Sequence, residues 1–193
     1  MASFEPAVAY VLQDEGGYSP ANAATGDPET NWGIIDTTAR AYGYTGPMSA
    51  LPLQTAKDIY HQEYWTGLDA VKDQRVATAA LTYRVNMGTY GGTLVLQRAL
   101  NQVGAEVSED GGFGPETLAA VNAVDPSTLL QAIVDSAVDH YQEIVTSNPK
   151  KAPYLDGWIN RAERILSMPA VEAAGAGLGL LALGMVVFFA GRK

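Results

Sequence analysis

The chain has 193 residues, no Cys, and 12 Lys and Arg against 21 Asp and Glu, which gives a formal net charge of −9. At this length we expect one domain, or one domain with an appendage, and a hydrophobic content of 47% with 17% charged residues is typical of a chain that folds around a core. The missing Cys excludes a disulfide scaffold, a thiol nucleophile and Cys-ligated metal sites, and the acidic balance argues against nucleic acid as a partner.

The first expected element is a helix near the N-terminus that ends in a carboxylate. Apolar residues recur at helical spacing from Phe4 to Val11, and Glu15 continues the same stripe. Gly16 and Gly17 follow, and glycine with a positive φ commonly ends a helix. A carboxyl group at this position faces the negative end of the helix dipole and abuts apolar neighbours, so both effects favour its protonated form. A general acid in glycoside cleavage needs such a protonated carboxyl group.

An exposed acid without a function would show the same local pattern at a helix end. Glu15 alone therefore does not establish a general acid, and the segment after it supplies further evidence. Residues 18–35 are rich in turn-forming residues and aromatics, and they contain Asp27, Glu29 and Thr30. A small β-hairpin is expected here. Because sugars bind through aromatic faces and polar side chains, this loop is a candidate platform for a saccharide.

The remainder of the body is expected to be helical, which makes the fold mainly α. Apolar residues recur at helical spacing in five further segments, which are residues 52–60, 76–87, 96–103, 126–145 and 155–168, and Pro115 opens a further short helix. His61 and His140 are far apart in the chain, and no HExxH, GxSxG or GxxxxGK[ST] pattern occurs. We therefore expect no metal and no cofactor, and carboxylate chemistry is what remains.

The C-terminal segment differs in kind from the body. Residues 173–191 form a run of 19 uncharged residues that would span roughly 28 Å as a helix, close to the thickness of a bilayer core. The run has no polar face and is rich in Gly, as membrane helices are. It predicts a single transmembrane helix over 170–191, with bacterial inner membrane as a partner through 173–191. Gly175 and Gly179 form a GxxxG pair that would permit weak self-association.

Several short motifs occur in an order that resembles glycoside hydrolase family 108. They are Glu-Gly-Gly-Tyr at 15–18, Thr-Asn-Trp-Gly-Ile at 30–34, Ala-x-x-Ile-Tyr and Tyr-Trp within 56–65, Val-Asn-Met-Gly at 85–88, Leu-Gln-Arg-Ala-Leu at 96–100, Asp-Gly-Gly-Phe-Gly-Pro-Glu-Thr at 110–117 and Gly-Trp-Ile-Asn-Arg at 157–161. Members of this family are lysozyme-like N-acetylmuramidases, common among phage endolysins. The resemblance covers roughly residues 4–165.

The resemblance implies a role for individual residues. Glu15 matches the catalytic glutamate, and Thr30 matches a Thr that positions the attacking water. The segment before Thr30 is shorter than in the family, so the second carboxylate stays open between Asp27, our first choice, and Glu29. The implied substrate-binding residues are Tyr18, Glu29, Asn31, Trp32, Tyr64 and Asn86. Peptidoglycan glycan strands are the implied partner.

We therefore expect a lysozyme-like catalytic region over 1–90, a helical peptidoglycan-binding-like region over 91–168 packed on it, and the membrane helix. The leading function is hydrolysis of the bond between N-acetylmuramic acid and N-acetylglucosamine by a membrane-tethered endolysin that acts in the periplasm of the host. One alternative is a lytic transglycosylase that uses the same Glu15. Another is a non-catalytic wall-binding or holin-like membrane protein.

Overall fold

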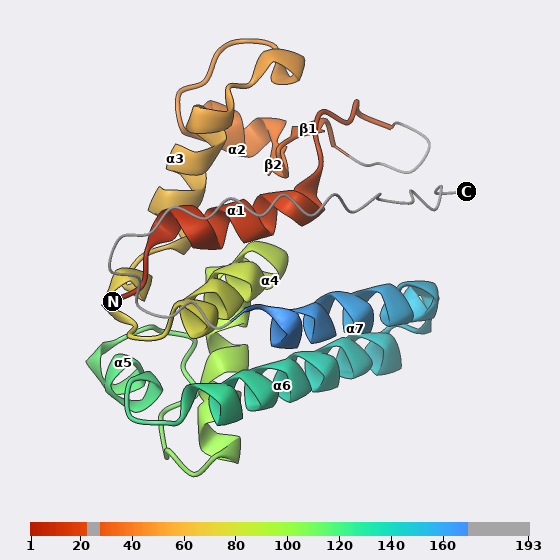
Figure 1. The fold of residues 1–193 in the computed structure, drawn as a ribbon. Helices are drawn as coiled ribbons and strands as arrows, with labels where there is room; N and C mark the ends of the chain where they lie inside the picture. The colour runs from red at the N-terminus through yellow and green to blue at the C-terminus, as the bar shows by residue number, and fades with distance from the viewer. Residues whose placement is uncertain (23–27, 170–193) are drawn as a thin grey trace.

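Helices make up most of the computed structural model, which describes residues 1–22 and 28–169 (Figure 1). The α-helices of these residues are α1 (Phe4–Glu15), α2 (Asp36–Ala41), α3 (Leu53–Tyr64), α4 (Gln74–Gln102), α5 (Pro115–Val121), α6 (Pro126–Ser147) and α7 (Leu155–Glu163). Two strands, β1 (Thr30–Asn31) and β2 (Ile34–Ile35), pair antiparallel. Short 3-10 helices are η1 (Met48–Ala50), η2 (Leu68–Ala70), η3 (Pro149–Tyr154) and η4 (Arg164–Ser167). The predicted helical body and small hairpin are thus confirmed.

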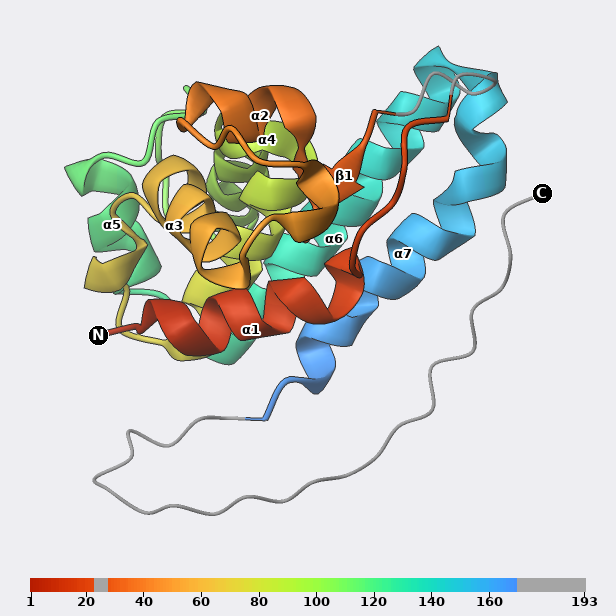
Figure 2. The same cartoon turned by 90° about the horizontal axis from the view of Figure 1, so that it is seen from above.

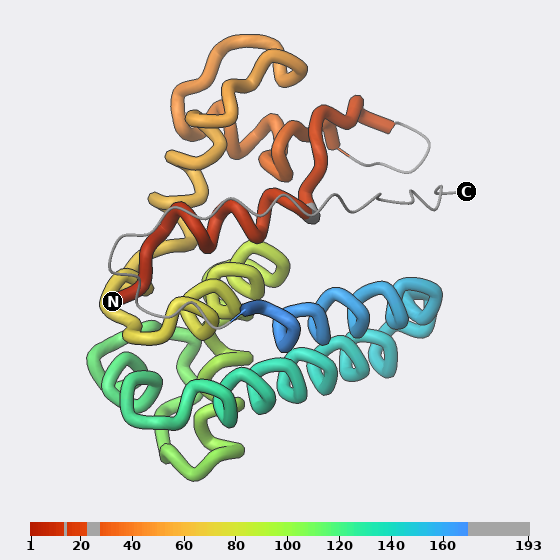
Figure 3. Tube along the Cα trace, in the orientation of Figure 1, coloured from red at the N-terminus to blue at the C-terminus, as the bar shows by residue number. Residues whose placement is uncertain are grey.

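Helix α1 occupies a central position between two groups of elements. Its apolar stripe is buried at Ala7, Val8 and Val11, and it packs against α3 and α4. Figures 1 and 3 show the hairpin, α2 and α3 on one side of α1, and α4, α6 and α7 on the other. The predicted helix end is confirmed, since Gly16 follows Glu15 with a φ of 63°. The C-terminal end of α1 therefore reaches the place where the hairpin begins.

The hairpin is built around a two-residue turn. Asn31 pairs with Ile34, so the turn consists of Trp32 and Gly33, whose φ angles are 52° and 76°. Two central residues with positive φ match the twist of the flanking strands, which is why such turns join short antiparallel pairs. A third segment joins this small sheet, because Ser19 forms an isolated bridge with Thr30. The loop after α1 is thereby tied to β1.

Helix α4 stands where the sequence predicts two helices. Apolar periodicity predicts one helix over 76–87 and another over 96–103, with a turn at Val-Asn-Met-Gly between them. The structure agrees with this, because α4 consists of two helical segments joined across a kink at Gly88, whose φ of 76° and ψ of 159° are not helical. The helix begins at an Asp73 cap, which accepts hydrogen bonds from two backbone N–H groups. Beyond the kink, Gly92 lies so close to the backbone of Arg84 that a Cβ there would be 2.3 Å from its nitrogen.

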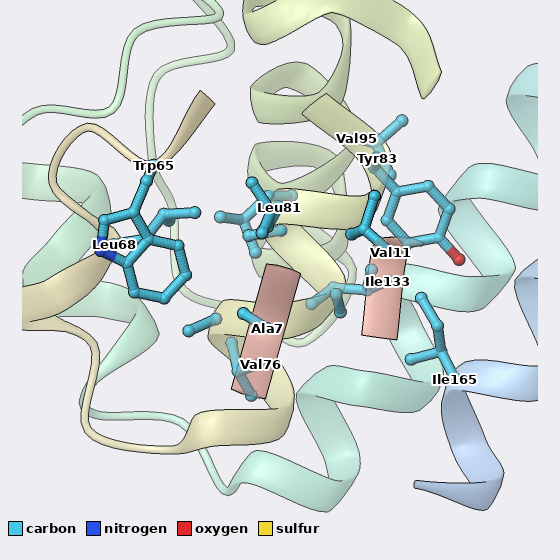
Figure 4. Packing of buried hydrophobic residues seen from close by; sticks show 14 of the residues in the cluster. Ala7, Val11, Trp65, Leu68, Val76, Leu81, Tyr83, Val95, Ile133 and Ile165 are labelled. Carbon is cyan, nitrogen blue, oxygen red and sulfur yellow. The ribbon is translucent and has the colours of Figure 1, made fainter. Parts of the chain in front are cut away.

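One continuous apolar core joins the two halves of the chain. Figure 4 shows side chains from α1, α4 and α6 packed together, with Ala7, Val11, Leu81 and Ile133 among them. Ile165 from η4 belongs to the same buried cluster. Helix α4 packs against both α1 and α6. The expected division at residue 90 falls within α4 and stays a prediction.

The prediction of a fold class that includes a membrane-spanning helix is corrected. Within residues 1–22 and 28–169, no helix is both long enough and apolar enough to cross a membrane. The segment on which the prediction rests, residues 170–191, lies outside the described residues, as do Gly175 and Gly179. Localisation at the host inner membrane as a single-span protein is corrected on the same finding, and neither membrane partnership nor self-association is supported.

Candidate active site at the end of α1

Three groups from different elements meet at the C-terminal end of α1. A Cβ atom placed on Gly33 would lie 2.5 Å from the hydroxyl oxygen of Tyr60 and 2.6 Å from Oε2 of Glu15. Because both distances are shorter than real contacts of a Cβ, only glycine leaves room here for the phenol and the carboxyl group. The turn of the hairpin, helix α3 and helix α1 thus contribute one group each to a small volume around Glu15, which is partly buried.

Tyr60 connects the helix face to the hairpin. Its side chain is 1% exposed, and its hydroxyl donates a hydrogen bond of 2.9 Å to the carbonyl oxygen of Trp32. Burial raises the pKa of Tyr60 above its usual value, and the nearby charge of Glu15 and the Tyr64 phenol add to the effect. The phenol therefore keeps its proton at all ordinary pH values and acts as a fixed hydrogen-bond donor beside the carboxyl group.

Tyr64 lies one helical turn further along α3 and is partly exposed. Its ring centroid is 5.9 Å from that of Tyr60. Burial again raises the pKa of the phenol, followed by the charges of Glu63 and Glu15. Two neutral phenols therefore flank Glu15, and the partly exposed one has a ring that a saccharide could contact. The role of Tyr64 as a substrate-binding residue stays a prediction.

The strand and loop before the turn contain other candidates. Thr30 lies in β1, and its backbone exchanges two hydrogen bonds with Ser19, of 2.8 and 2.9 Å. The carboxylate of Glu29 accepts a hydrogen bond of 2.8 Å from the hydroxyl of the exposed Tyr18, and this bond raises the pKa of Tyr18. Thr30 and Glu29 thus belong to the same hairpin that brings Gly33 to Glu15. Asp27 lies outside the described residues.

Asn31 and Trp32 use their polar atoms within the protein. The amide of Asn31, a residue only 4% exposed, donates to the carbonyl of Met48 at 2.7 Å. The indole N–H of Trp32 donates to the carbonyl of Leu51 at 3.0 Å. Both bonds fasten the hairpin to the segment around η1, so they hold the turn in place against Tyr60 and Glu15.

Asn86 lies beside residues of α6 and α7. It lines a cavity of about 320 Å³ between α4, α6 and α7, where its side-chain oxygen accepts a hydrogen bond of 3.3 Å from Arg161. The structure brings Asn86 to Trp158 and Arg161, which belong to the Gly-Trp-x-x-Arg motif. Its role as a substrate-binding residue stays a prediction.

Sequence reasoning missed several residues that shape the site. Tyr60 and Gly33 belong to the motifs but receive no role from them, since burial of a phenol beside a glycine turn depends on tertiary contact. Arg84 was also missed. Its buried guanidinium donates to the carbonyls of Tyr64 and Thr66 at 3.0 and 2.9 Å, which fixes the end of α3. Burial lowers the pKa of Arg84 to about 10.

The Asp-Gly-x-x-Gly-Pro-x-Thr segment forms an internal hydrogen-bonded loop. The buried amide of Gln97 donates to the carboxylate of Asp110 at 2.8 Å and to the carbonyl of Gly112 at 2.9 Å, and it accepts from the N–H of Gly111. The hydrogen bonds from Gln97 and from the Gly112 backbone lower the pKa of Asp110. The loop is therefore held against α4 by polar contacts, and Pro115 begins α5 directly after it.

Two family models match successive parts of the chain. Residues 8–88 match the family described as Glycosyl hydrolase 108, and residues 91–163 match the one described as Predicted Peptidoglycan domain. The two matches meet near the Gly88 kink of α4. They support a glycoside hydrolase that has peptidoglycan as its partner.

A solved structure supports the same assignment over most of the chain. "Structure of Brucella abortus SagA" is similar with a TM-score of 0.69 and 26% sequence identity, and the alignment covers 85% of this chain and 91% of that one. No curated protein sequence matches significantly. Together with the two family matches, this likeness supports a lytic-type enzyme of the family 108 kind and a peptidoglycan hydrolase activity.

Proposed function

We propose that this protein is an N-acetylmuramidase that cleaves the β-1,4 bond between N-acetylmuramic acid and N-acetylglucosamine, with Glu15 as the general acid. The observation that carries the proposal is the convergence of Glu15, the Tyr60 hydroxyl and the Gly33 turn, since a Cβ at Gly33 would lie within 2.6 Å of both other groups. A carboxyl group at the C-terminal end of a helix faces the negative end of the helix dipole, which favours its protonated form.

In the proposed reaction, Glu15 gives its proton to the glycosidic oxygen. The bond from the anomeric carbon of the muramic acid to that oxygen breaks, and N-acetylglucosamine leaves with a free 4-hydroxyl group. A water molecule positioned by Thr30 attacks the anomeric carbon and passes a proton to a second carboxylate, for which Asp27 is the first candidate and Glu29 the second. The product ends in a reducing N-acetylmuramic acid.

The surrounding residues would support these steps. The Tyr60 phenol, fixed by its hydrogen bond to Trp32, would keep the carboxyl group of Glu15 in one position. The partly exposed Tyr64 ring and the exposed Tyr18 ring would contact sugar faces. Because a positioned acid contributes typically about 100- to 10,000-fold to such reactions, the placement of Glu15 is the largest single contribution we expect from one side chain.

Analysis of the products tests this proposal. Purified peptidoglycan is digested with the full chain, and the soluble fragments are examined by mass spectrometry before and after borohydride reduction. Reducing N-acetylmuramic acid ends, which gain two hydrogens, are the expected result. Anhydro ends would overturn hydrolysis and assign a lytic transglycosylase, in which the 6-hydroxyl of the substrate attacks. Reducing N-acetylglucosamine ends would overturn the proposed bond.

Breakage of glycan strands weakens a bacterial wall. We therefore also propose that lysis of a host cell, as by a phage endolysin, is the biological outcome. Turbidity of cells whose outer membrane has been made permeable would fall on addition of the protein. Cells that stay intact while their purified peptidoglycan is digested would contradict this part of the proposal alone.

A further inference from the structure

The cavity between α4, α6 and α7 has the features of a binding site of its own. Its volume of about 320 Å³ lies at the lower end of the range usual for small-molecule sites. Its lining includes Asn86, Met87, His140, Tyr141, Trp158 and Arg161. They come from the Val-Asn-x-Gly and Gly-Trp-x-x-Arg motifs and from α6, so the fold brings together parts of the chain that are as distant as Asn86 and Arg161, 75 positions apart.

Arg161 supplies the charge of this pocket. Its guanidinium donates to the side-chain oxygen of Asn86 at 3.3 Å, and among the described residues it forms no ion pair with a carboxylate. A guanidinium has five N–H groups, so several donors are available beside the one that Asn86 uses. Burial lowers the pKa of His140, and the positive charge of Arg98 lowers it too while Glu143 opposes the shift. His140 is therefore neutral at pH 7, and Arg161 remains as the cation.

The aromatic residues of the pocket leave little scope for sugar stacking. The ring of Trp158 already stacks with Tyr154 at a centroid distance of 6.0 Å and packs against Tyr141 at 5.3 Å. A pyranose ring would have to displace one of them. A cation beside an amide and an apolar wall of Met87 and Trp158 is better suited to a short chain that carries carboxylates and aliphatic carbons.

We propose that this cavity binds the acidic stem peptide of peptidoglycan, with Arg161 holding one of its carboxylates. The proposal rests on the proposed function for its substrate class, because the stem peptide is attached to the muramic acid whose bond would be cleaved. Figures 1 and 2 show α7, which carries Trp158 and Arg161, on the same side of the molecule as the end of α1 that carries Glu15. Glycan and peptide could therefore contact one face of the protein.

The test measures peptide binding separately from catalysis. The probe is the free tetrapeptide of L-alanine, D-glutamate, diaminopimelate and D-alanine, titrated into the full chain by calorimetry. We expect saturable binding that Arg161→Gln weakens about tenfold or more, since it removes a charged hydrogen-bond donor. Lys150→Gln is the matched control, because Lys150 is an exposed cation of neighbouring η3 that does not line the cavity. It should bind the tetrapeptide as the parent does.

Further arms separate the ligand classes. The same tetrapeptide with its carboxyl groups amidated should bind as weakly to the parent as the unmodified peptide binds to Arg161→Gln. Circular dichroism and Tm establish that the variant is folded. Tri-N-acetylglucosamine, titrated in the same way, serves as the glycan probe. The proposal would be overturned if the parent does not bind the tetrapeptide, or if the parent and Arg161→Gln bind it equally. It would also be overturned if Arg161→Gln loses binding of tri-N-acetylglucosamine. If tetrapeptide binding depends on Arg161 but the parent chain does not digest peptidoglycan, the proposed function fails while this inference stands.

Discussion

Replacement of Gly33 by alanine probes the site where its three groups meet. Gly33 has a φ of 76°, and a left-handed backbone costs a residue with a Cβ about 1–2 kcal/mol. The new methyl group would lie 2.5 Å from the Tyr60 hydroxyl, so the phenol must move and lose its hydrogen bond to Trp32, at a cost of about 1 kcal/mol. The free energy of unfolding should fall by about 2–3 kcal/mol, which lowers Tm by about 4–12 °C.

The same methyl group would displace the carboxyl group of Glu15, from which it would be 2.6 Å away. A misplacement of about 1 Å can cost about 100-fold in rate, so kcat for peptidoglycan should fall by that order. Gly43→Ala is the control, because Gly43 has a φ of 84° but a Cβ added there would have no atom within 4 Å. It should lose about 1–2 kcal/mol of stability and keep its rate. If the two variants have equal rates, the site does not depend on the Gly33 contact.

Three further changes test other parts of the structure. Tyr60→Phe removes the hydroxyl that fixes the hairpin beside Glu15, so the free energy of unfolding measured in urea should fall by about 1 kcal/mol. The same change should reduce kcat more than it changes KM. An unchanged kcat would contradict this. Gln97→Leu should lower the free energy of unfolding measured in urea by about 1–3 kcal/mol, because it leaves Asp110 and Gly112 without their hydrogen-bond donor. An unshifted urea midpoint would mean that other contacts hold the loop around Asp110. Burial lowers the pKa of His140, so the unfolded chain binds more protons as the pH falls through about 6.5 and stability decreases on acidification. His140→Gln should make Tm less dependent on pH between about 7 and 5, and an equal slope would contradict the shift.

The helices were predictable where one strong local signal determines them. Pro115 and Pro126 begin α5 and α6 as expected, and the apolar stripe of α1 is buried as its spacing predicts. Gly88 between two periodic segments likewise indicates a turn, and the structure has non-helical backbone there. What the apolar spacing does not show is that Gly92 packs directly on the backbone of Arg84. Such a close approach is a tertiary contact that periodicity does not contain.

The candidate site was predictable only as a set of motifs. The sequence points to Glu15 through its place at a helix end and through the resemblance of the neighbouring segments. It could not indicate that Tyr60 would turn its hydroxyl toward the hairpin, because a tyrosine on an apolar helix face is usually a core residue. It also could not indicate that Asn86 would lie beside Arg161, which is 75 positions away in another motif. Motif order does not specify which motifs meet in space.

The central claim is that Glu15 is the general acid, and comparison of two glutamate variants tests it most directly. Glu15→Gln and Glu5→Gln both change one carboxyl group of α1 to an amide, and Glu5 lies at the opposite end of the helix, paired with Lys57. The measurement is the rate at which new reducing ends form in purified peptidoglycan. We expect Glu5→Gln to match the parent and folded Glu15→Gln to be slower by about 100-fold or more. A Glu15→Gln variant that is as fast as the parent would contradict the claim.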